Sequence, residues 1–374
     1  MLGLCFPVFA QAPHLLLGAS RTDKYLPMLE DKSVALVVNP TSRVSGQHLA
    51  DFLLDNKIQV VKIFAPEHGF RGNAEAGQTI KSGTDSRTGL PVVSLYGKNK
   101  KPSEKQLKGV DWVIFDIQDV GVRFYTYIST LHYVMQTCAE LGKPLLVLDR
   151  PNPNGDYIDG PVLEKEHKSF VGMHPIPVVH GLTIGELAQM INGEGWLGNG
   201  LECLLKVVPM KNYKRAQRYE LPVKPSPNLP NFQAVRLYPS LCFFEGTVIS
   251  EGRGTYFPFQ TYGFPDPAFG PFSYVPKSID GMSKYPKHKG KTCYGKDLRK
   301  TMVKPMLDLS YLVDAYHTYK ETKPFFNKFF TKLAGTARLQ QQIEQSWSAR
   351  KIRKSWEKEL SSYRKMRENY LLYK

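Results

Sequence analysis

Short apolar runs alternate with amphipathic segments along the first two-thirds of the chain. The runs are rich in β-branched residues and carry few polar ones, which is typical of strands covered on both faces of a sheet. They span residues 34–39, 60–66, 91–96, 112–117, 144–149 and 204–208. Between them, residues 127–142 repeat apolar side chains every three or four positions, and Thr183–Glu186 has the composition of a capping box that opens a helix. This alternation predicts an α/β fold with a mainly parallel, doubly wound sheet and helices on both faces.

The pattern changes after about residue 220. Prolines become frequent, and residues 246–276 are rich in Gly and Pro, which break regular structure. Residues 340–363 predict one helix with an apolar stripe of Ile352, Trp356, Leu360 and Tyr363. Its basic side chains are interpreted as a solvated face: Arg350, Lys351, Arg353 and Lys354. We therefore predict a second, smaller α+β domain in the last third of the chain.

Composition adds a charge imbalance to this picture. The 374 residues fit two domains, and the net charge is +16. A basic surface suits a polyanionic partner, such as nucleic acid, an anionic membrane or an acidic cell-wall glycan, or it serves solubility alone. The five cysteines form no CxxC pair, so no zinc or redox framework is indicated; the four besides Cys5 are interpreted as free and buried, with a disulfide as the alternative.

The N-terminus resembles part of a targeting signal. Residues 1–10 are apolar and uncharged, and Val8–Ala10 resembles a cleavage site with small residues, although the usual basic start is missing. The alternative is a buried N-terminal strand. No later stretch approaches the roughly 20 apolar residues of a membrane span. We therefore expect a periplasmic or secreted protein, with a truncated signal peptide and without stable membrane insertion.

Two motif matches fail in their context. Residues 193–198 fit GxGxxG but follow a helix instead of a strand, and residues 290–296 approach a phosphate-binding loop in which Asp297 replaces the required Ser or Thr. Neither HExxH nor GxSxG occurs, and no nucleic-acid-binding module is recognisable. The sequence therefore favours no nucleotide cofactor and no zinc hydrolase.

Polar side chains follow the predicted strands. Asn39, Glu67, Asp116, Asp119 and Asp149 each stand at or just beyond a strand end. In open α/β sheets ligands bind beyond the carboxyl ends of the strands, so these side chains are expected to share one site. The alternative for each is a cap of the following helix or turn. Four polar, Gly-rich segments carry most of this chemistry: residues 65–72, 115–127, 148–164 and 241–255.

At these segments the sequence resembles the exo-β-N-acetylmuramidase (NamZ) family, glycoside hydrolase family 171, formerly domain of unknown function 1343. The matching runs are PEHGFRG, FDIQDVG-RFYTY, LDRPNPNG, GMHPIPV-HGLT-GELA, PSPN-P and LCFFEGT--SEGRGT. They lie within residues 34–260, and six separated matches in the same order make the resemblance specific. The C-terminal third matches only through its aromatic, basic ending.

The resemblance implies an exo-acting hydrolase that removes terminal, non-reducing β-1,4-linked N-acetylmuramic acid from peptidoglycan fragments. It implies a Rossmann-like N-terminal domain and a smaller C-terminal domain, with the site in a cleft between them, and no metal or other cofactor. We predict an N-terminal extension with the signal remnant over residues 1–21, a catalytic domain over 22–255, and an α+β domain over 256–374 that completes the cleft. The sequence leaves the oligomeric state open.

Glycoside hydrolysis usually needs a proton donor and a second group that attacks or activates water. Glu67 is the expected acid, because it follows an apolar strand and apolar surroundings favour a protonated carboxyl, and His68 would orient it. Glu164 is the expected second carboxylate, with Asp116 and Asp119 next. The acetamido group of the sugar is the alternative nucleophile.

Muramic acid differs from N-acetylglucosamine by a lactyl carboxylate, which an arginine fork suits. The candidates are Arg71, Arg123 and Arg253, each of which has a structural ion pair as its alternative role. Further expected sugar-binding residues are Tyr125, Asn152, Asn154, Asn228, Glu245 and Glu251. Two other classes stay open: a non-catalytic muramyl-glycan binding protein, and a nucleotide- or nucleic-acid-binding α/β protein.

Overall fold

The computed structural model describes residues 14–71 and 83–373. Residues 1–10 of the predicted signal segment, with Cys5, and Gly72 lie outside the described residues, whereas residues 14–21 of the predicted N-terminal extension lie within them. Cys138, Cys203, Cys242 and Cys293 are free, buried thiols, as expected. No helix in the described part of the chain is long and apolar enough to cross a bilayer.

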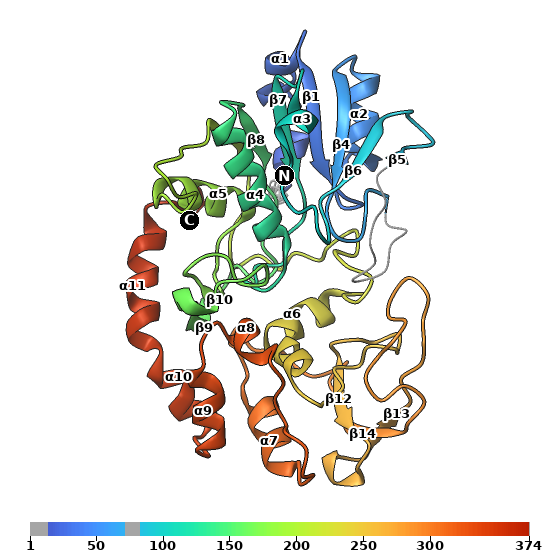
Figure 1. The fold of residues 1–374 in the computed structure, drawn as a ribbon, viewed down its shortest axis with the longest axis vertical. Coiled ribbons are helices and arrows are strands. Elements are labelled where there is room, and N and C mark those ends of the chain that lie inside the picture. The colour runs from blue at the N-terminus through green and yellow to red at the C-terminus, as the bar shows by residue number, and fades with distance from the viewer. Residues whose placement is uncertain (1–13, 72–82, 374) are drawn as a thin grey trace, which may run out of the picture.

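A seven-stranded sheet forms the centre of the N-terminal domain (Figure 1). In spatial order its strands are β11 (Leu205–Val208), β8 (Leu145–Leu148), β7 (Trp112–Asp116), β1 (Ser33–Val38), β4 (Gln59–Ala65), β6 (Pro91–Ser94) and β5 (Gly83–Thr84). Every neighbouring pair is parallel except β5 with β6. Because β1 lies between β4 and β7, strand order reverses at β1, as in Rossmann-like folds. The predicted fold class is confirmed.

Helices cover both faces of this sheet. Along β1, Ala35 and Val37 pack on one side, whereas Leu36 and Val38 pack on the other. The first side is covered by α4 (Tyr127–Glu140) and α5 (Ile184–Gly193), and the second by α1 (Leu26–Leu29) and α2 (Leu49–Asp55). The strands are continuous apolar runs because both of their faces are buried. The predicted capping box is also present, since Thr183 N donates to Glu186 Oε2 at 2.9 Å and Glu186 N donates to Thr183 Oγ1 at 3.3 Å.

A smaller antiparallel sheet lies in the second domain, in the order β12-β14-β13. The bounds of these strands are Thr261–Phe264 for β12, Phe272–Tyr274 for β13 and Cys293–Asp297 for β14. Nearby helices are α6 (Phe232–Leu241), α7 (Ser310–Thr318) and α8 (Phe330–Ala334). Other short elements are β2 (Arg43–Val44), β3 (Gln47–His48), α3 (Glu104–Leu107), β9 (Asp159–Val162) and β10 (Pro177–Val179).

The single helix predicted over residues 340–363 is wrong. The chain forms α9 (Arg338–Glu344), α10 (Ala349–Ser355) and α11 (Glu357–Glu368) instead. Ser346 has a φ of +58°, which no α-helix accommodates. The predicted apolar stripe is nevertheless buried, and Arg353 leaves the solvated face to pair with Asp159 at 2.6 Å.

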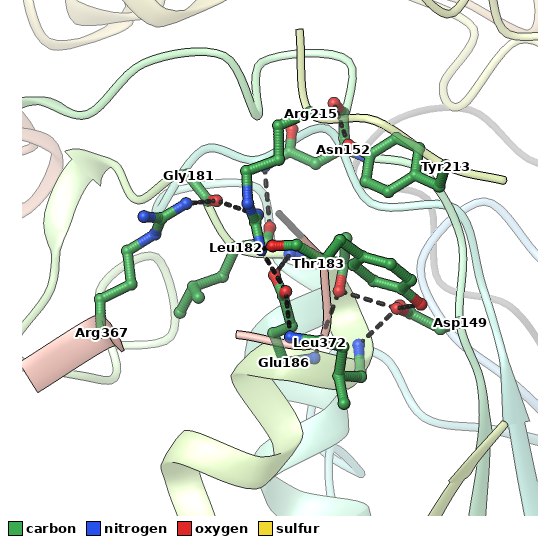
Figure 2. Close-up of polar contacts among 12 residues, drawn as sticks. Asp149, Asn152, Gly181, Leu182, Thr183, Glu186, Tyr213, Arg215, Arg367 and Leu372 are labelled. Carbon is green, nitrogen blue, oxygen red and sulfur yellow. Dashed lines mark hydrogen bonds and ion pairs between the residues drawn. The ribbon is translucent and has the colours of Figure 1, made fainter. Parts of the chain in front are cut away.

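The C-terminal segment returns to the N-terminal domain beside α5 (Figure 1). Figure 2 shows the polar contacts that hold it there. Leu372 N donates to Glu186 Oε1 at 2.8 Å, and Arg367 Nη2 donates to Gly181 O at 2.7 Å. Arg215 binds both acceptors, Gly181 O at 2.9 Å and the Glu186 carboxylate. The two domains are therefore joined by the returning chain end as well as by the chain between them.

Candidate active site

One cavity of about 230 Å³ lies beyond the carboxyl ends of β4 and β6, at the start of α4. Residues of both domains line this cavity. They are Glu67, His68, Tyr96, Phe124, Tyr125, Thr126, Tyr127, Phe170, Val171, Ser226, Asn228, Leu229, Tyr238, Glu245, Arg253, Phe259 and Phe329. Six of these were predicted as site residues from the sequence: Glu67, His68, Tyr125, Asn228, Glu245 and Arg253. The cavity is large enough for a single monosaccharide unit.

A tight turn presents Glu67 to the cavity. Gly69 N donates to Pro66 O at 3.1 Å, which closes the turn directly after β4. His68 occupies its third position with a φ of +70°, a left-handed conformation that normally favours Gly. A non-glycine residue held in this region stores backbone strain, which concentrates at functional sites. The turn thus fixes the direction of Glu67.

Hydroxyl groups surround Glu67. Thr126 Oγ1 donates to Glu67 Oε2 at 3.0 Å, and the Tyr127 hydroxyl donates to Glu67 O at 3.3 Å. Tyr96 lies close enough that burial, the Glu67 charge and a hydrogen bond to Glu67 raise the pKa of Tyr96 to about 12. Its phenol therefore stays protonated at neutral pH and acts as a donor. The carboxyl group is oriented from two elements, the loop after β6 and the start of α4.

Another part of the cavity wall carries an ion pair. Arg253 donates to Glu245 Oε1 from Nε at 3.0 Å and from Nη2 at 2.5 Å. Behind it, Glu251 lies 3.4 Å from Arg253 Nε and 3.0 Å from Lys287 Nζ. Burial raises the pKa of Glu251, but the charges of Lys287 and Arg253 outweigh burial and hold that pKa below its ordinary value. Arg253 and Lys287 are thus both held in place by carboxylates. Glu251 does not line the cavity itself but fixes the position of Arg253, which does.

Aromatic rings form much of the remaining surface. Tyr238 makes edge-to-face contacts with Phe124, Tyr125 and Phe259 at centroid distances of 5.4, 6.0 and 4.9 Å. The Tyr125 hydroxyl donates to Pro225 O at 2.6 Å, so its ring is fixed. Rigid aromatic faces beside a few polar groups are typical of small-ligand sites.

Three of the predicted site residues lie away from this cavity, each because it has a charged partner elsewhere. Asp116 is fully buried against Arg150, with Oδ1–Nε and Oδ2–Nη2 distances of 2.5 and 2.8 Å. Glu164 pairs with Arg338 at 2.8 Å on the surface. Arg71 binds two carboxylates, Asp51 at 3.1 Å and Asp85 at 2.8 Å.

Arg123 is completely buried, although it was predicted to bind the sugar. Its Nη1 donates to Pro161 O and Ile176 O at 2.7 and 2.8 Å, and its Nη2 donates to Leu333 O and Ala334 O at 3.0 and 2.7 Å. Burial lowers the pKa of Arg123 to about 9. These four carbonyl contacts make Arg123 a structural link between the N-terminal domain and the end of α8.

Three further predicted residues are buried in the loops beside the sheet. Asn152 Nδ2 donates to Leu182 O at 2.8 Å, and Asn154 Nδ2 donates to Val120 O at 2.9 Å. Asp119 accepts a bond from Gly121 N at 2.7 Å. None of the three lines the cavity, and each shapes the loops that carry Tyr125 and its neighbours.

Sequence reasoning missed several wall residues. Tyr96 stands at the end of a predicted strand, and Thr126 and Ser226 stand within the motif runs, so strand-end position and motif membership could have found them. Phe170 and Phe329 carry no such signal, because only the tertiary fold brings them to the cavity.

Fold and site together define a two-domain α/β protein whose interdomain cavity combines an oriented carboxyl group, an arginine and aromatic rings, a set of groups suited to sugar chemistry. Family models agree with this class. The description "Exo-beta-N-acetylmuramidase NamZ, N-terminal" matches residues 34–233, and the corresponding C-terminal model matches residues 236–373. The chain therefore belongs to the NamZ exo-β-N-acetylmuramidase family.

Individual relatives support this membership. The peptidoglycan β-N-acetylmuramidase NamZ of Bacillus subtilis is 40% identical over 378 residues, which cover 93% of this chain and 89% of the relative. Two crystal structures of DUF1343 family proteins from Bacteroides fragilis are also similar. One has a TM-score of 0.90 at 45% identity and covers 97% of this chain and 99% of its own. The other has a TM-score of 0.82 at 30% identity and covers 97% and 100%.

Proposed function

We propose that this protein hydrolyses terminal, non-reducing β-1,4-linked N-acetylmuramic acid from peptidoglycan fragments. The observation that carries the proposal is the placement of Glu67 on the wall of a one-sugar cavity, with donors from Thr126 and Tyr96 beside it. A relative that shares 40% of its residues bears the name of this activity. A cavity of this size also suits exo-acting cleavage, because it takes one terminal unit and leaves the rest of the glycan outside.

Glu67 acts as the proton donor to the leaving oxygen. Among the described residues that line the cavity, Glu245 is the other carboxylate, and it is held in place by its bonds to Arg253. The second role therefore falls to Glu245 or to the acetamido group of the sugar. A substrate with a trifluoroacetamido group separates the two: its rate falls steeply if the acetamido oxygen attacks, and changes little if Glu245 activates water.

Arg253 is the arginine that recognises the lactyl carboxylate. Arg71 and Arg123 are occupied by two carboxylates and by four carbonyls, respectively, away from the cavity. Arg253 uses Nε and Nη2 for Glu245, and we infer that Nη1 is the atom that binds the ligand. A guanidinium can bind one carboxylate from each side because it has five N–H donors in one plane.

The deciding experiment is Glu67→Gln, assayed for release of N-acetylmuramic acid from the MurNAc-GlcNAc disaccharide, whose sugar leaving group needs a proton. We expect kcat to fall by about 10³-fold or more, because a general acid commonly contributes 10²–10⁴-fold. Glu164→Gln is the matched control, since that carboxylate pairs with Arg338 outside the cavity and its loss leaves activity intact. Unchanged turnover in Glu67→Gln rules out Glu67 as the acid. A wild-type protein that binds the sugar without cleaving it is instead a non-catalytic binding protein.

The nucleotide-binding alternative has less support. In a Rossmann-like sheet a nucleotide lies at the point where strand order reverses, here between β1 and β7. Polar groups at that point bind one another: Arg150 pairs with Asp116, and the main-chain Gln118 N donates to Thr41 Oγ1 at 3.0 Å. We infer that neither nucleotides nor nucleic acid are the physiological ligands, and a thermal-shift comparison of N-acetylmuramic acid with nucleotides tests this inference.

A periplasmic or secreted location is part of the same proposal, because peptidoglycan lies outside the cytoplasm. Residues 1–10 are the predicted signal segment. Fractionation of cells that express the full-length gene tests the location, and a purely cytoplasmic protein contradicts it.

A further inference from the structure

The chain between β13 and β14 extends from the small sheet towards the N-terminal domain (Figure 1). We call residues 276–291 of this connection the basic loop. It is attached to two positions of the cavity wall. Asn228 Nδ2 donates to Met282 O at 2.8 Å, and Lys277 N donates to Gly254 O at 2.8 Å, next to Arg253. The loop therefore stands directly beside the cavity.

The charge of the basic loop is one-sided. It contains five lysines, Lys277, Lys284, Lys287, Lys289 and Lys291, and a single acidic residue, Asp280. Lys287 points inward, where its Nζ donates to Phe244 O at 2.5 Å, to Ile249 O at 2.9 Å and to Glu251 at 3.0 Å. The other four lysines are exposed, and no ion pair joins them to any residue in 14–71 or 83–373. One lysine thus anchors the loop and four present charge to solvent.

An aromatic ring stands among these charges. Tyr285 is 80% exposed, and the Nζ atoms of Lys284 and Lys289 each lie 5.8 Å from its ring centroid. Its neighbour Pro286 is buried against Gly254, where an added Cβ would come within 2.5 Å of Pro286 Cγ. The backbone below the ring is therefore fixed although the ring is exposed. A held, exposed tyrosine flanked by cations offers a flat face for a sugar and charges for carboxylates.

We propose that the basic loop binds the glycan beyond the cleaved sugar, through carboxylates carried by that chain. The proposal rests on the proposed function, because the cavity holds only the terminal unit and the remaining chain must leave it past a neighbouring surface. Polyanion binding by exposed lysines is sensitive to salt, whereas binding of one sugar to the partly buried Arg253 is much less so. Carboxylates come from two sources in such a glycan, the lactyl groups of further muramic acids and the peptides attached to them.

The test compares substrates of increasing length in a triple variant, Lys284→Gln, Tyr285→Ala and Lys289→Gln. We expect KM for a peptide-free glycan of several disaccharides to rise about tenfold at low salt, with kcat unchanged, because two surface cations and one stacking face contribute this order of binding energy. Hydrolysis of a chromogenic N-acetylmuramide stays at the wild-type rate. The wild-type KM for the long glycan also rises with salt, and that of the variant, which keeps Lys277 and Lys291, rises less.

The matched control is the double variant Lys105→Gln with Lys108→Gln, which removes two positive charges from exposed lysines in and next to α3. These lysines precede the amino end of β7, whereas the cavity lies beyond the carboxyl ends of the strands. If the control raises KM as much as the triple variant, net charge alone is responsible and the proposal fails. It also fails if the triple variant hydrolyses every substrate as the wild type does, or if it loses affinity only for a DNA oligonucleotide.

The substrates also identify which carboxylates the basic loop binds. Lost affinity for peptide-free glycan assigns the lactyl carboxylates, and loss confined to peptide-bearing glycan assigns the peptide carboxylates. A wild-type protein that is inactive on the chromogenic substrate contradicts the proposed function instead.

Discussion

The hydroxyl of Tyr373 donates a hydrogen bond to Oδ2 of Asp149 at 2.6 Å, which ties the C-terminal segment to the end of β8. The same hydroxyl accepts a bond from Met210 N at 2.7 Å. Thr183 Oγ1 and Gly185 N also donate to the Asp149 carboxylate, both at 2.8 Å. Burial raises the pKa of Asp149 to about 6 even though Tyr373 and the other donors favour its charged form. The buried carboxylate depends on a residue more than 220 positions away in the sequence.

Removal of that hydroxyl should destabilise the protein without changing its chemistry. Tyr373→Phe leaves Asp149 with one donor fewer and Met210 N without its acceptor, so we expect a loss of about 1–3 kcal/mol in the free energy of unfolding. Urea denaturation at pH 7 measures the loss. Tyr370→Phe is the matched control, because its hydroxyl bonds to Glu194 near the surface and its loss should cost less. An equal effect of both variants contradicts the assigned role of Tyr373.

Arg123 should be a stability residue and not a sugar-binding residue. In Arg123→Met the four carbonyls that the guanidinium binds lose their donor, and an unsatisfied buried acceptor costs about 1–3 kcal/mol. We expect a loss above about 3 kcal/mol in unfolding free energy. Gly335→Ala should also destabilise, because its Cβ would lie 2.6 Å from Arg123 Nη2 at a φ of +71°. Arg299→Met, at an exposed pair with Asp297, is the control with little effect.

The parallel sheet could be predicted almost completely from the sequence. Strands buried on both faces need apolar runs, and the six predicted strands agree with the observed ones to within two residues at either end. The C-terminal helices could not be predicted as well, because an apolar stripe reports which face is buried and not where the helix is interrupted. The positive φ at Ser346 follows from packing that no local pattern records.

Part of the cavity wall was predicted, and the predicted residues that lie elsewhere are bound by other groups of the protein. Glu67, Glu245 and Arg253 lie in motif runs and reach the cavity. Asp116 also follows a strand, but the neighbouring strand end supplies Arg150, and two opposite charges that meet at a sheet edge pair with each other instead of with a ligand. Strand-end position therefore indicates where polar residues gather, and only the fold shows which of them face the cavity.

Arg253 should control the choice between muramic acid and glucosamine substrates. Arg253→Lys keeps a positive charge near Glu245 but loses the planar fork, so it cannot hold Glu245 and a lactyl carboxylate together. We expect kcat/KM for a chromogenic N-acetylmuramide to fall by about 10–100-fold, equivalent to about 1.4–2.8 kcal/mol. The low activity on the matching N-acetylglucosaminide should change much less. Equal losses on both substrates would mean that Arg253 serves only the structure of the wall.

Asp119 should make stability depend on pH. Burial raises the pKa of its carboxyl to about 7, although bonds from Gly121 N and Val120 N oppose the rise. Oδ2 lies 3.7 Å from His180 Nε2, and burial lowers the pKa of His180 to about 3, so no cation compensates Asp119 near neutral pH. Unfolded aspartate titrates near 3.9. Between about pH 4 and pH 7 the folded state therefore binds more protons than the unfolded state, and the Asp119 contribution to stability is lost as pH rises.

Buried histidines with lowered pKa values, such as His48 and His132, give the opposite slope, so the wild-type curve alone does not isolate Asp119. The quantity to measure is the difference in unfolding free energy between Asp119→Asn and the wild type, from urea denaturation at pH 5, 6, 7 and 8. We expect this difference to shift in favour of the variant with rising pH by up to a few kcal/mol, since one pKa unit corresponds to about 1.4 kcal/mol. Asp280→Asn, at an exposed position in the basic loop, should give a flat difference. A difference for Asp119→Asn that is equally flat would mean that the carboxyl group is already ionised throughout this range and that a charge is tolerated beneath the cavity.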